Sequence, residues 1–264
     1  MSCFIMLILI AESKTMSSAQ YAIKDIEFQN HQPIFESFAD ELMLFLAQKS
    51  PLEISQLMSI SGSLAIKVHK LSYDFPNKSM GYKSYEGFTG EVFKSLDFST
   101  LESEDLKFAQ SNIKIISSTY GLLSLTDVIK PYRTEFNKYI IGGKETPIRF
   151  YKQKNTIALV NFLKKNGVKE IINLLPSDAD ATLDWKIIRA YAKMHKIIFK
   201  TISSKGELKT PATGRLKELR GLMAREIIKN RILTYNTLIQ TTSPNFLFSP
   251  LDSKAGLPVF IVEE

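Results

Sequence analysis

The sequence contains very little cysteine and histidine. Cys3 is the only cysteine among 264 residues, so no disulfide can form within the chain, which fits a reducing compartment. The three histidines, His31, His69 and His195, lie far apart, and none has a partner at a metal-ligand spacing. We therefore expect no metal site, in particular no iron site built from thiolate or imidazole ligands, and no cofactor.

Long apolar runs are also absent. No stretch approaches the roughly 18–20 apolar residues that a membrane-spanning helix needs. The opening MSCFIMLILI has no basic region before its short apolar run, and Glu12 and Lys14 follow at once, so it does not resemble an export signal. We expect a soluble, cytoplasmic protein without a membrane partner, in which FIMLILI forms a buried central strand. Met6 is an alternative start, which would make Met1–Ile5 an annotation artefact.

Neither of the common glycine-rich nucleotide-binding loops occurs in the sequence. The nearest approach to a magnesium-binding pattern is a group of three acidic residues, Asp178, Asp180 and Asp184. They come just before a predicted helix, where carboxylates more often complement the helix dipole than bind a metal.

Positive charge is concentrated in one part of the chain. The formal net charge is +7 and the pI is about 9.2. Lys193–Arg231 contains 11 Lys/Arg and three Asp/Glu, a balance of +8, so the remaining residues sum to −1. Such a stretch favours an acidic partner; the alternative is a solvated surface that only adds solubility.

Strand and helix patterns alternate irregularly along the chain. The predicted strands are Phe4–Ile10, Ile113–Ser117, Lys138–Ile141, Val168–Leu175, Lys196–Ile202 and Pro258–Val262. The main predicted helices are Pro33–Gln48, Pro51–Leu57, Ser63–Leu71, Leu101–Gln110, Thr156–Lys165, Leu183–Met194 and Thr213–Asn230. We expect a mixed α/β or α+β fold, with a mixed sheet and surrounding helices in a single domain over residues 6–264.

The predicted helix Thr213–Asn230 carries much of the positive charge. At 100° per residue its apolar side chains form one stripe, which we expect to be buried: Leu216, Leu219, Met223 and Ile227. Lys217 and Arg220 fall at the edge of this stripe, where a cleft would run, whereas Arg225 and Lys229 fall on the side expected to be solvated. These positions make Lys217 and Arg220 candidates for binding an anion.

Two further features of this helix bear on its role. Gly221 is costly inside a helix, so either another backbone or a ligand approaches closely there, or the helix kinks. Thr213 is a candidate cap at the positive end of the helix dipole, where phosphate binds readily.

Five segments resemble, in order, those of the YaaA family of bacterial peroxide-stress proteins. They are LILIAESKT (Leu7–Thr15), GFTGEVF (Gly87–Phe93), STYGLLSLTDVIKPYR (Ser118–Arg133), INL (Ile172–Leu174) and KELRGLMAREIIKNRI (Lys217–Ile232). The resemblance implies an α/β protein with a basic cleft that is cytoplasmic, binds DNA and limits iron-dependent oxidative DNA damage by hydrogen peroxide. The family usually has SPAKT or SPSKT where this chain has AESKT, so its proline is missing here.

The segment LMSISGSLA (Leu57–Ala65) is similar to a helix-hairpin-helix element, in which backbone N–H groups hold a DNA phosphate without reading sequence. Ser59 and Ser61 stand where the motif has glycines, and Gly62 and Ser63 follow. The alternative is a plain connection between two core helices.

Two functional hypotheses follow. In the first, the protein is not an enzyme and binds double-stranded DNA, independent of sequence, through phosphate contacts in a basic cleft; the predicted contacts are Lys14, Thr15, Ser59, Ser61, Gly62, Ser63, Arg133, Lys217 and Arg220.

In the second, the protein is an enzyme acting on a phosphate-containing or nucleotide-like small molecule. The cations above, together with Thr15 and Tyr132, would then converge on one pocket. An open groove would favour DNA and an enclosed pocket would favour the enzyme.

Overall fold

A central sheet of five strands organises the fold. The structure, a computed structural model, describes residues 6–16, 31–76 and 81–263, so the interpretation of Met1–Ile5 lies outside it. The sheet order is β4-β3-β1-β6-β7. The bounds are Met6–Ala11 for β1, Ile113–Ser117 for β3, Gly121–Ser124 for β4, Glu170–Asn173 for β6 and Lys193–Lys196 for β7. β3, β1, β6 and β7 run parallel, and β4 is an antiparallel edge strand.

β1 lies at the centre of this sheet because it is apolar on both faces, as the sequence predicted. All six of its residues are buried. Ile8 and Ile10 pack into the larger hydrophobic core, and Leu7 and Leu9 into the smaller one. Successive side chains of a strand point to opposite faces, so the two cores lie on opposite sides of the sheet.

A second sheet of order β10-β11-β8-β9 follows the first along the chain. Its strands are Ile198–Ile202 (β8), Leu208–Lys209 (β9), Leu247–Lys254 (β10) and Leu257–Ile261 (β11). The predicted single strand Lys196–Ile202 is therefore wrong, because the chain passes from one sheet to the other at Ile197. Lys138–Ile141 is also not a strand. A short pair, β2 (Tyr82–Lys83) and β5 (Val128–Ile129), completes the strands described.

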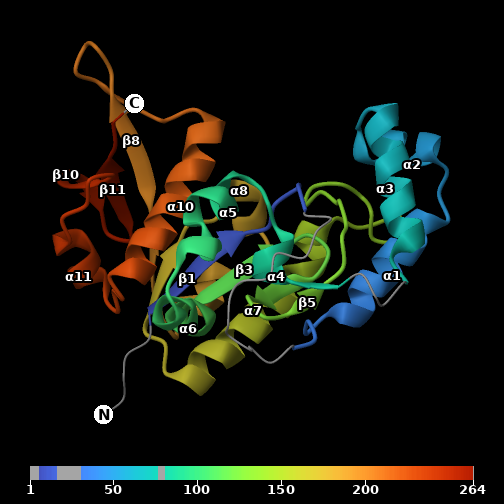
Figure 1. Ribbon diagram of the computed structural model, residues 1–264, viewed down its shortest axis with the longest axis horizontal. Helices are drawn as coiled ribbons and strands as arrows, with labels where there is room; N and C mark the ends of the chain where they lie inside the picture. Colours follow the sequence, from blue (N-terminus) through green and yellow to red (C-terminus); the bar gives the residue numbers. More distant parts are fainter. Residues whose placement is uncertain (1–5, 17–30, 77–80, 264) are drawn as a thin grey trace.

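Helices cover both faces of the central sheet and extend beyond it. Their bounds are Glu36–Ala47 (α1), Pro51–Met58 (α2), Gly62–Asp74 (α3), Ser84–Gly87 (α4), Glu91–Leu96 (α5), Ser103–Asn112 (α6), Pro147–Asn166 (α7), Ser177–Asp180 (α8), Trp185–Ile188 (α9), Thr213–Lys229 (α10) and Tyr235–Gln240 (α11). Figure 1 shows α1–α3 at one end of the molecule, with the second sheet, α10 and α11 at the other end. The mixed α/β fold class is confirmed.

Several helix boundaries follow from local sequence. α2 begins with a capping box, in which the Ser50 side chain accepts from the Glu53 N–H and the Glu53 carboxylate accepts from the Ser50 N–H. α7 begins nine residues earlier than predicted, at Pro147 after the Thr146 cap. Within the ranges described, no helix is both long and apolar enough to cross a membrane.

Candidate functional site

A pocket of about 1060 Å³ lies at the carboxyl ends of β1 and β6. Glu12–Thr15 follow β1, Pro176–Asp178 follow β6, and the starts of α5 and α10 close the remaining sides. β3, the next strand of this sheet along the chain, pairs with one edge of β1, and β6, which comes later, pairs with its other edge. The pocket therefore lies where the strand order reverses, which is where open α/β sheets characteristically bind ligands.

The start of α10 forms one wall of this pocket. Ala212 is the N-cap residue and makes no side-chain cap, so the prediction that Thr213 caps the helix is wrong: Thr213 is its first residue. The Leu216 N–H donates to the Ala212 carbonyl at 2.9 Å. The N–H groups of Thr213 and Gly214, which precede Leu216 at the start of the helix, have no backbone partner in the described structure. Uncapped N–H groups at the positive end of a 17-residue helix attract an anion.

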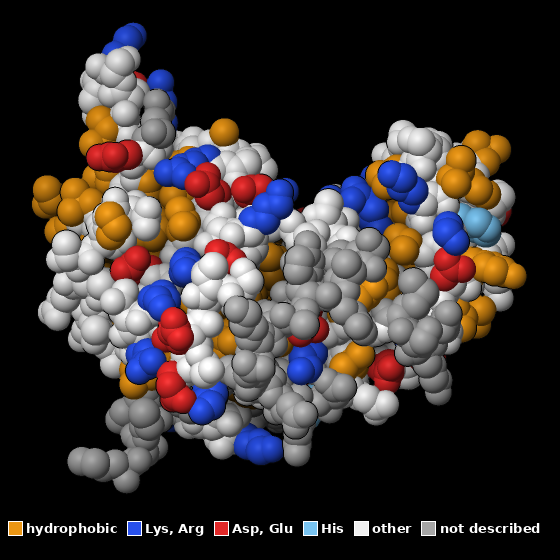
Figure 2. Space-filling model, in the orientation of Figure 1, with side chains coloured by type: hydrophobic (Ala, Val, Ile, Leu, Met, Phe, Trp, Pro, Cys, Tyr) orange, Lys and Arg blue, Asp and Glu red, His pale blue; other side chains and the backbone are white. Residues whose placement is uncertain are grey.

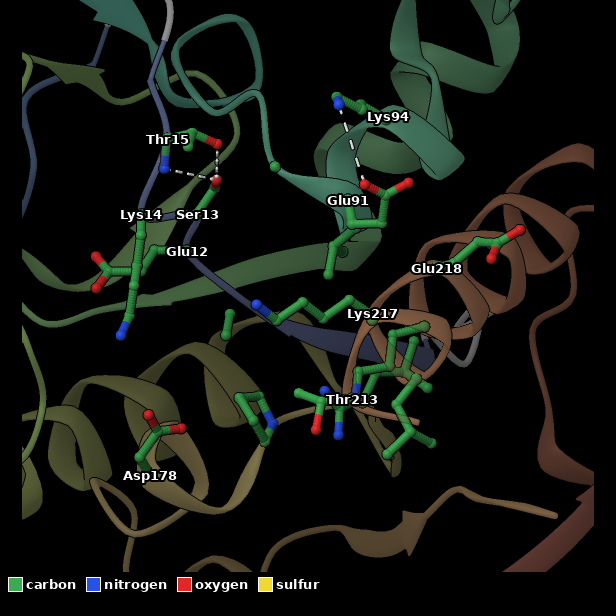
Figure 3. A pocket seen from close by; sticks show the side chains of 18 of the residues that line it. Glu12, Ser13, Lys14, Thr15, Glu91, Lys94, Asp178, Thr213, Lys217 and Glu218 are labelled. Atoms are coloured by element: carbon green, nitrogen blue, oxygen red, sulfur yellow. Dashed lines mark hydrogen bonds and ion pairs between the residues drawn. The ribbon is translucent and has the colours of Figure 1, made fainter. Parts of the chain in front are cut away.

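Two of the predicted cations project from α10 into the pocket. Figure 3 shows Lys217 reaching across it toward the residues that follow β1. Lys217 is exposed, and no acidic side chain within the described ranges pairs with it. Arg220 is half-buried; burial lowers its pKa, and the charge of Asp178 opposes that shift. Arg220 remains cationic because guanidinium is not deprotonated in proteins.

The loop after β1 supplies the opposite wall. Lys14 is exposed and forms an ion pair with Glu135. Thr15 turns back on Ser13: its N–H donates to Ser13 Oγ at 3.1 Å, and the two hydroxyl oxygens lie 3.0 Å apart. Arg133 does not line the pocket. Its Nη1 donates to the Lys14 carbonyl at 2.8 Å, and this hydrogen bond stabilises the loop after β1. The structure thus brings Lys14, Thr15, Lys217 and Arg220 together.

The hairpin candidates lie elsewhere, between α2 and α3. Ser59 has a left-handed backbone (φ 54°), the conformation that favours glycine, and its hydroxyl accepts from Lys138 Nζ at 3.0 Å. Ser61 has φ −63° and caps α3 by accepting from the Leu64 N–H at 3.4 Å. Only Ser59 therefore has the backbone conformation that favours glycine, and Ser61 has an extended one. Gly62 and Ser63 begin α3, and their N–H groups have no partner in the structure described.

Sequence reasoning missed Glu12, which lines the pocket. Ser118 and Tyr132 donate hydrogen bonds to its carboxylate. Burial raises the pKa of Glu12 to about 7, although these hydroxyl groups lower it in part. The available signal was a carboxylate directly after a fully buried strand, at the position where the family usually has proline.

Two further sequence predictions for α10 have different outcomes. Arg225 was expected to be solvated, but its guanidinium donates to the carbonyls of Leu96 (2.8 Å) and Asp97 (2.9 Å) at the end of α5. Of the alternatives left open at Gly221, the structure shows the close approach of another backbone, because a Cβ there would lie 2.2 Å from the carbonyl oxygen of Val92. α10 therefore packs directly against α5. Lys229 is exposed, yet it pairs with Asp105 at 2.8 Å.

The pocket carries both signs of charge. The cations that line it are Lys14, Lys94, Lys217 and Arg220, and the carboxylates are Glu12, Glu91, Asp178 and Glu218. Within the ranges described, no group of three or more His, Cys, Asp or Glu residues has a geometry that could hold a metal ion. The arrangement suits a polar ligand with a localised negative charge.

A parallel sheet with a charged pocket beyond its strand ends defines a class of mixed α/β proteins whose ligands bind at that edge. Within this class, residues 6–251 match the family described as peroxide stress protein YaaA, and the chain belongs to that family. The resemblance seen in the sequence is thereby confirmed.

Curated relatives match nearly the whole chain. A UPF0246 protein of Parabacteroides distasonis is 30% identical over 260 residues, which is 98% of this chain and 100% of the relative. One from Francisella tularensis subsp. novicida is 31% identical over 260 residues, covering 97% and 99%. One from Shewanella putrefaciens is 28% identical over 262 residues, covering 98% and 99%.

Proposed function

We propose that this protein acts during peroxide stress by binding double-stranded DNA through its phosphates, independent of sequence, and that it thereby limits iron-dependent oxidative damage. Membership of the peroxide stress protein YaaA family supports the stress role. The DNA contact is supported by how cationic side chains are distributed around a hollow in the surface.

That hollow separates the α2–α3 end of the molecule from the end with α10 and β8, and Lys and Arg side chains lie on both of its sides (Figure 2). On one side, α10 carries Lys217, which is exposed and has no acidic partner in the described structure. On the other is the α2–α3 turn, with the N–H groups of Gly62 and Ser63 and the ammonium group of Lys138 at Ser59. Donors on both sides of the hollow match two stretches of phosphate backbone.

The proposal depends most on one observation, that Lys217 is exposed and has no acidic partner in the described structure. An unpaired, exposed ammonium group binds phosphate without first breaking an ion pair. Lys14 must release Glu135, and Lys70 must release Asp74, before either binds DNA. We therefore expect Lys217 to dominate the contact from the α10 side.

Phosphate contacts also supply a physical route to protection. A duplex carries condensed cations, and a protein that neutralises phosphates with Lys and Arg releases them. Ferrous iron on the backbone would be displaced with the other cations, so hydroxyl radicals would form away from the DNA.

Fluorescence anisotropy with a labelled random duplex across a salt series tests the DNA contact. The variant Lys217→Ala/Arg220→Ala should bind more weakly, and its log–log salt slope should fall by up to about 2, since each phosphate contact contributes about 0.9. Lys165→Ala/Lys186→Ala is the matched control: it removes the same charge from exposed residues that do not line the pocket.

Either of two results would overturn the proposal. The first is no binding by the wild type at about 50 mM salt. The second is an equal loss in both double variants, which would mean that the charge is only solubilising surface. Nicking of supercoiled plasmid by ferrous iron and peroxide tests protection, which should be lost with the first double variant and kept with the second.

A further inference from the structure

We propose that the pocket at the carboxyl ends of β1 and β6 binds a second kind of ligand, a small phosphate monoester of the size of a nucleoside monophosphate. This site goes beyond DNA binding, because the proposed duplex contact is in the hollow between the two ends of the molecule, whereas the pocket has the volume of one small molecule. The proposal rests on the volume of the pocket, its localised phosphate-binding end, its carboxylates and its apolar lining residues.

The volume of about 1060 Å³ fits a whole small molecule. Small-molecule sites generally measure about 300–1,000 Å³, so this pocket is slightly larger than the upper limit of that range. An inorganic phosphate alone would leave most of it empty.

The phosphate-binding end is the start of α10. It presents the unpaired N–H groups of Thr213 and Gly214, with Lys217 and Arg220 one and two turns further along the same helix. The hydroxyl groups of Ser13 and Thr15 line the pocket as well. Backbone N–H groups, two cations and hydroxyl groups are the usual ligands of a terminal phosphate group.

The carboxylates argue against a polyanion inside the pocket. Glu91, Asp178 and Glu218 line the same space as the cations. A nucleic acid strand that filled the pocket would place several phosphates against them. A molecule with one phosphate end avoids this repulsion, and its hydroxyl or amino groups can donate to carboxylate oxygens.

Part of the pocket lining is apolar. Val92, Phe136, Leu174 and Leu216 contribute to it, and Phe136 and Leu174 are themselves buried within the fold. Apolar side chains around a few placed polar groups are characteristic of sites that hold a ring system. A phosphate-binding end together with apolar side chains in one pocket is what a nucleoside monophosphate requires.

Gly214 permits a test that leaves every charge in place. A Cβ at Gly214 would meet no atom within 4 Å, so a larger side chain there enters open space at the phosphate-binding end. Gly214 is the second residue of α10, where leucine is compatible with the backbone. Gly62→Leu is the matched control, since Gly62 also has open space around its Cβ and begins a helix away from the pocket.

Isothermal titration calorimetry would measure binding of the adenosine, guanosine, cytidine and uridine 5′-monophosphates and of inorganic phosphate. At least one monophosphate should bind the wild type with Kd below about 1 mM, which is about 4 kcal/mol. It should bind Gly214→Leu at least tenfold more weakly and Gly62→Leu as the wild type does. Inorganic phosphate should bind the wild type at least tenfold more weakly than that monophosphate.

Three results would overturn the inference: no monophosphate binds the wild type, Gly214→Leu binds as tightly as the wild type, or inorganic phosphate binds as tightly as the monophosphate.

Circular dichroism melting checks that Gly214→Leu is folded, and Arg220→Gln is the second variant if it is not. Duplex binding measured on the same proteins keeps the two proposals separate: Gly214→Leu should retain it within about twofold, and its absence in the wild type would overturn only the proposed DNA function.

Discussion

The hydroxyl group of Tyr132 donates a hydrogen bond to the carboxylate of Glu12, at a point where the pocket meets the protein interior. Ser117 Oγ lies 2.7 Å from the same hydroxyl oxygen, so Tyr132 links Glu12 to the end of β3. A carboxyl group in this environment keeps its proton at unusually high pH, because burial raises its pKa from 4.5 to about 7. Ionisation of Glu12 therefore has a cost in stability.

Substituting Glu12→Gln should flatten the pH dependence of stability. The folded state holds the Glu12 proton more tightly than the unfolded state does. The resulting stabilisation is present below pH 4.5 and is lost as pH rises through about 7. For a shift of this size the wild type should lose about 3 kcal/mol relative to Glu12→Gln between pH 5 and pH 8. Urea unfolding at both pH values measures this, and parallel losses in the two proteins would contradict it.

Substituting Gly221→Ala should destabilise the protein although alanine favours helices. A Cβ would lie 2.2 Å from the Val92 carbonyl oxygen, so α10 and α5 must move apart. Overpacking of this kind costs about 1–3 kcal/mol, which outweighs a propensity gain of up to about 1 kcal/mol.

Gly214→Ala in the same helix is the matched control for this substitution. Its Cβ meets nothing within 4 Å, so it should be neutral or stabilising by up to about 1 kcal/mol. Chemical denaturation of both variants measures the difference. Equal effects at the two positions would show that the contact with Val92 does not determine the cost.

Periodicity predicted the buried face of α10 but not its partners. Leu219, Met223 and Ile227 are buried as expected, because a 3.6-residue repeat shows which side of a helix is apolar. The same pattern assigned Arg225 to solvent. Its carbonyl partners Leu96 and Asp97 lie 129 and 128 residues away, and nothing local to α10 marks them.

The sequence predicted four residues of the pocket, but neither its shape nor Glu12. Family resemblance and charge together indicated Lys14, Thr15, Lys217 and Arg220, and all four line it. The placement of Glu12 depends on β1 lying between β3 and β6, which is a tertiary property. The division of Lys196–Ile202 between two sheets was hidden for the same reason, since nothing in the segment KIIFKTI marks a change of sheet.

Substituting Arg225→Met should lower stability by about 2 kcal/mol and leave DNA binding unchanged. Methionine keeps the apolar length of the side chain but cannot donate to the Leu96 and Asp97 carbonyls. The Asp97 carbonyl still accepts from the Thr100 N–H, whereas the Leu96 carbonyl loses the Arg225 donor. Arg225→Lys keeps the charge without the forked geometry and should recover only part of the loss. Urea unfolding and duplex anisotropy are the measurements. A variant of normal stability with weakened DNA binding would place Arg225 on the DNA surface instead.

Substituting Gly62→Pro should weaken duplex binding without unfolding the α2–α3 turn. Gly62 is the first residue of α3, where proline is favoured, and Ser61 before it has the extended backbone (φ −63°, ψ 152°) that precedes proline. The substitution therefore removes one N–H group and little else.

Gly62→Ala keeps that N–H group and should bind as the wild type does. Because a backbone donor adds no charge, affinity should fall several-fold at every salt concentration while the salt slope stays the same. If both variants bind the duplex equally well and melt at the wild-type temperature, the Gly62 N–H does not contact phosphate, and the contact belongs to the α10 side alone.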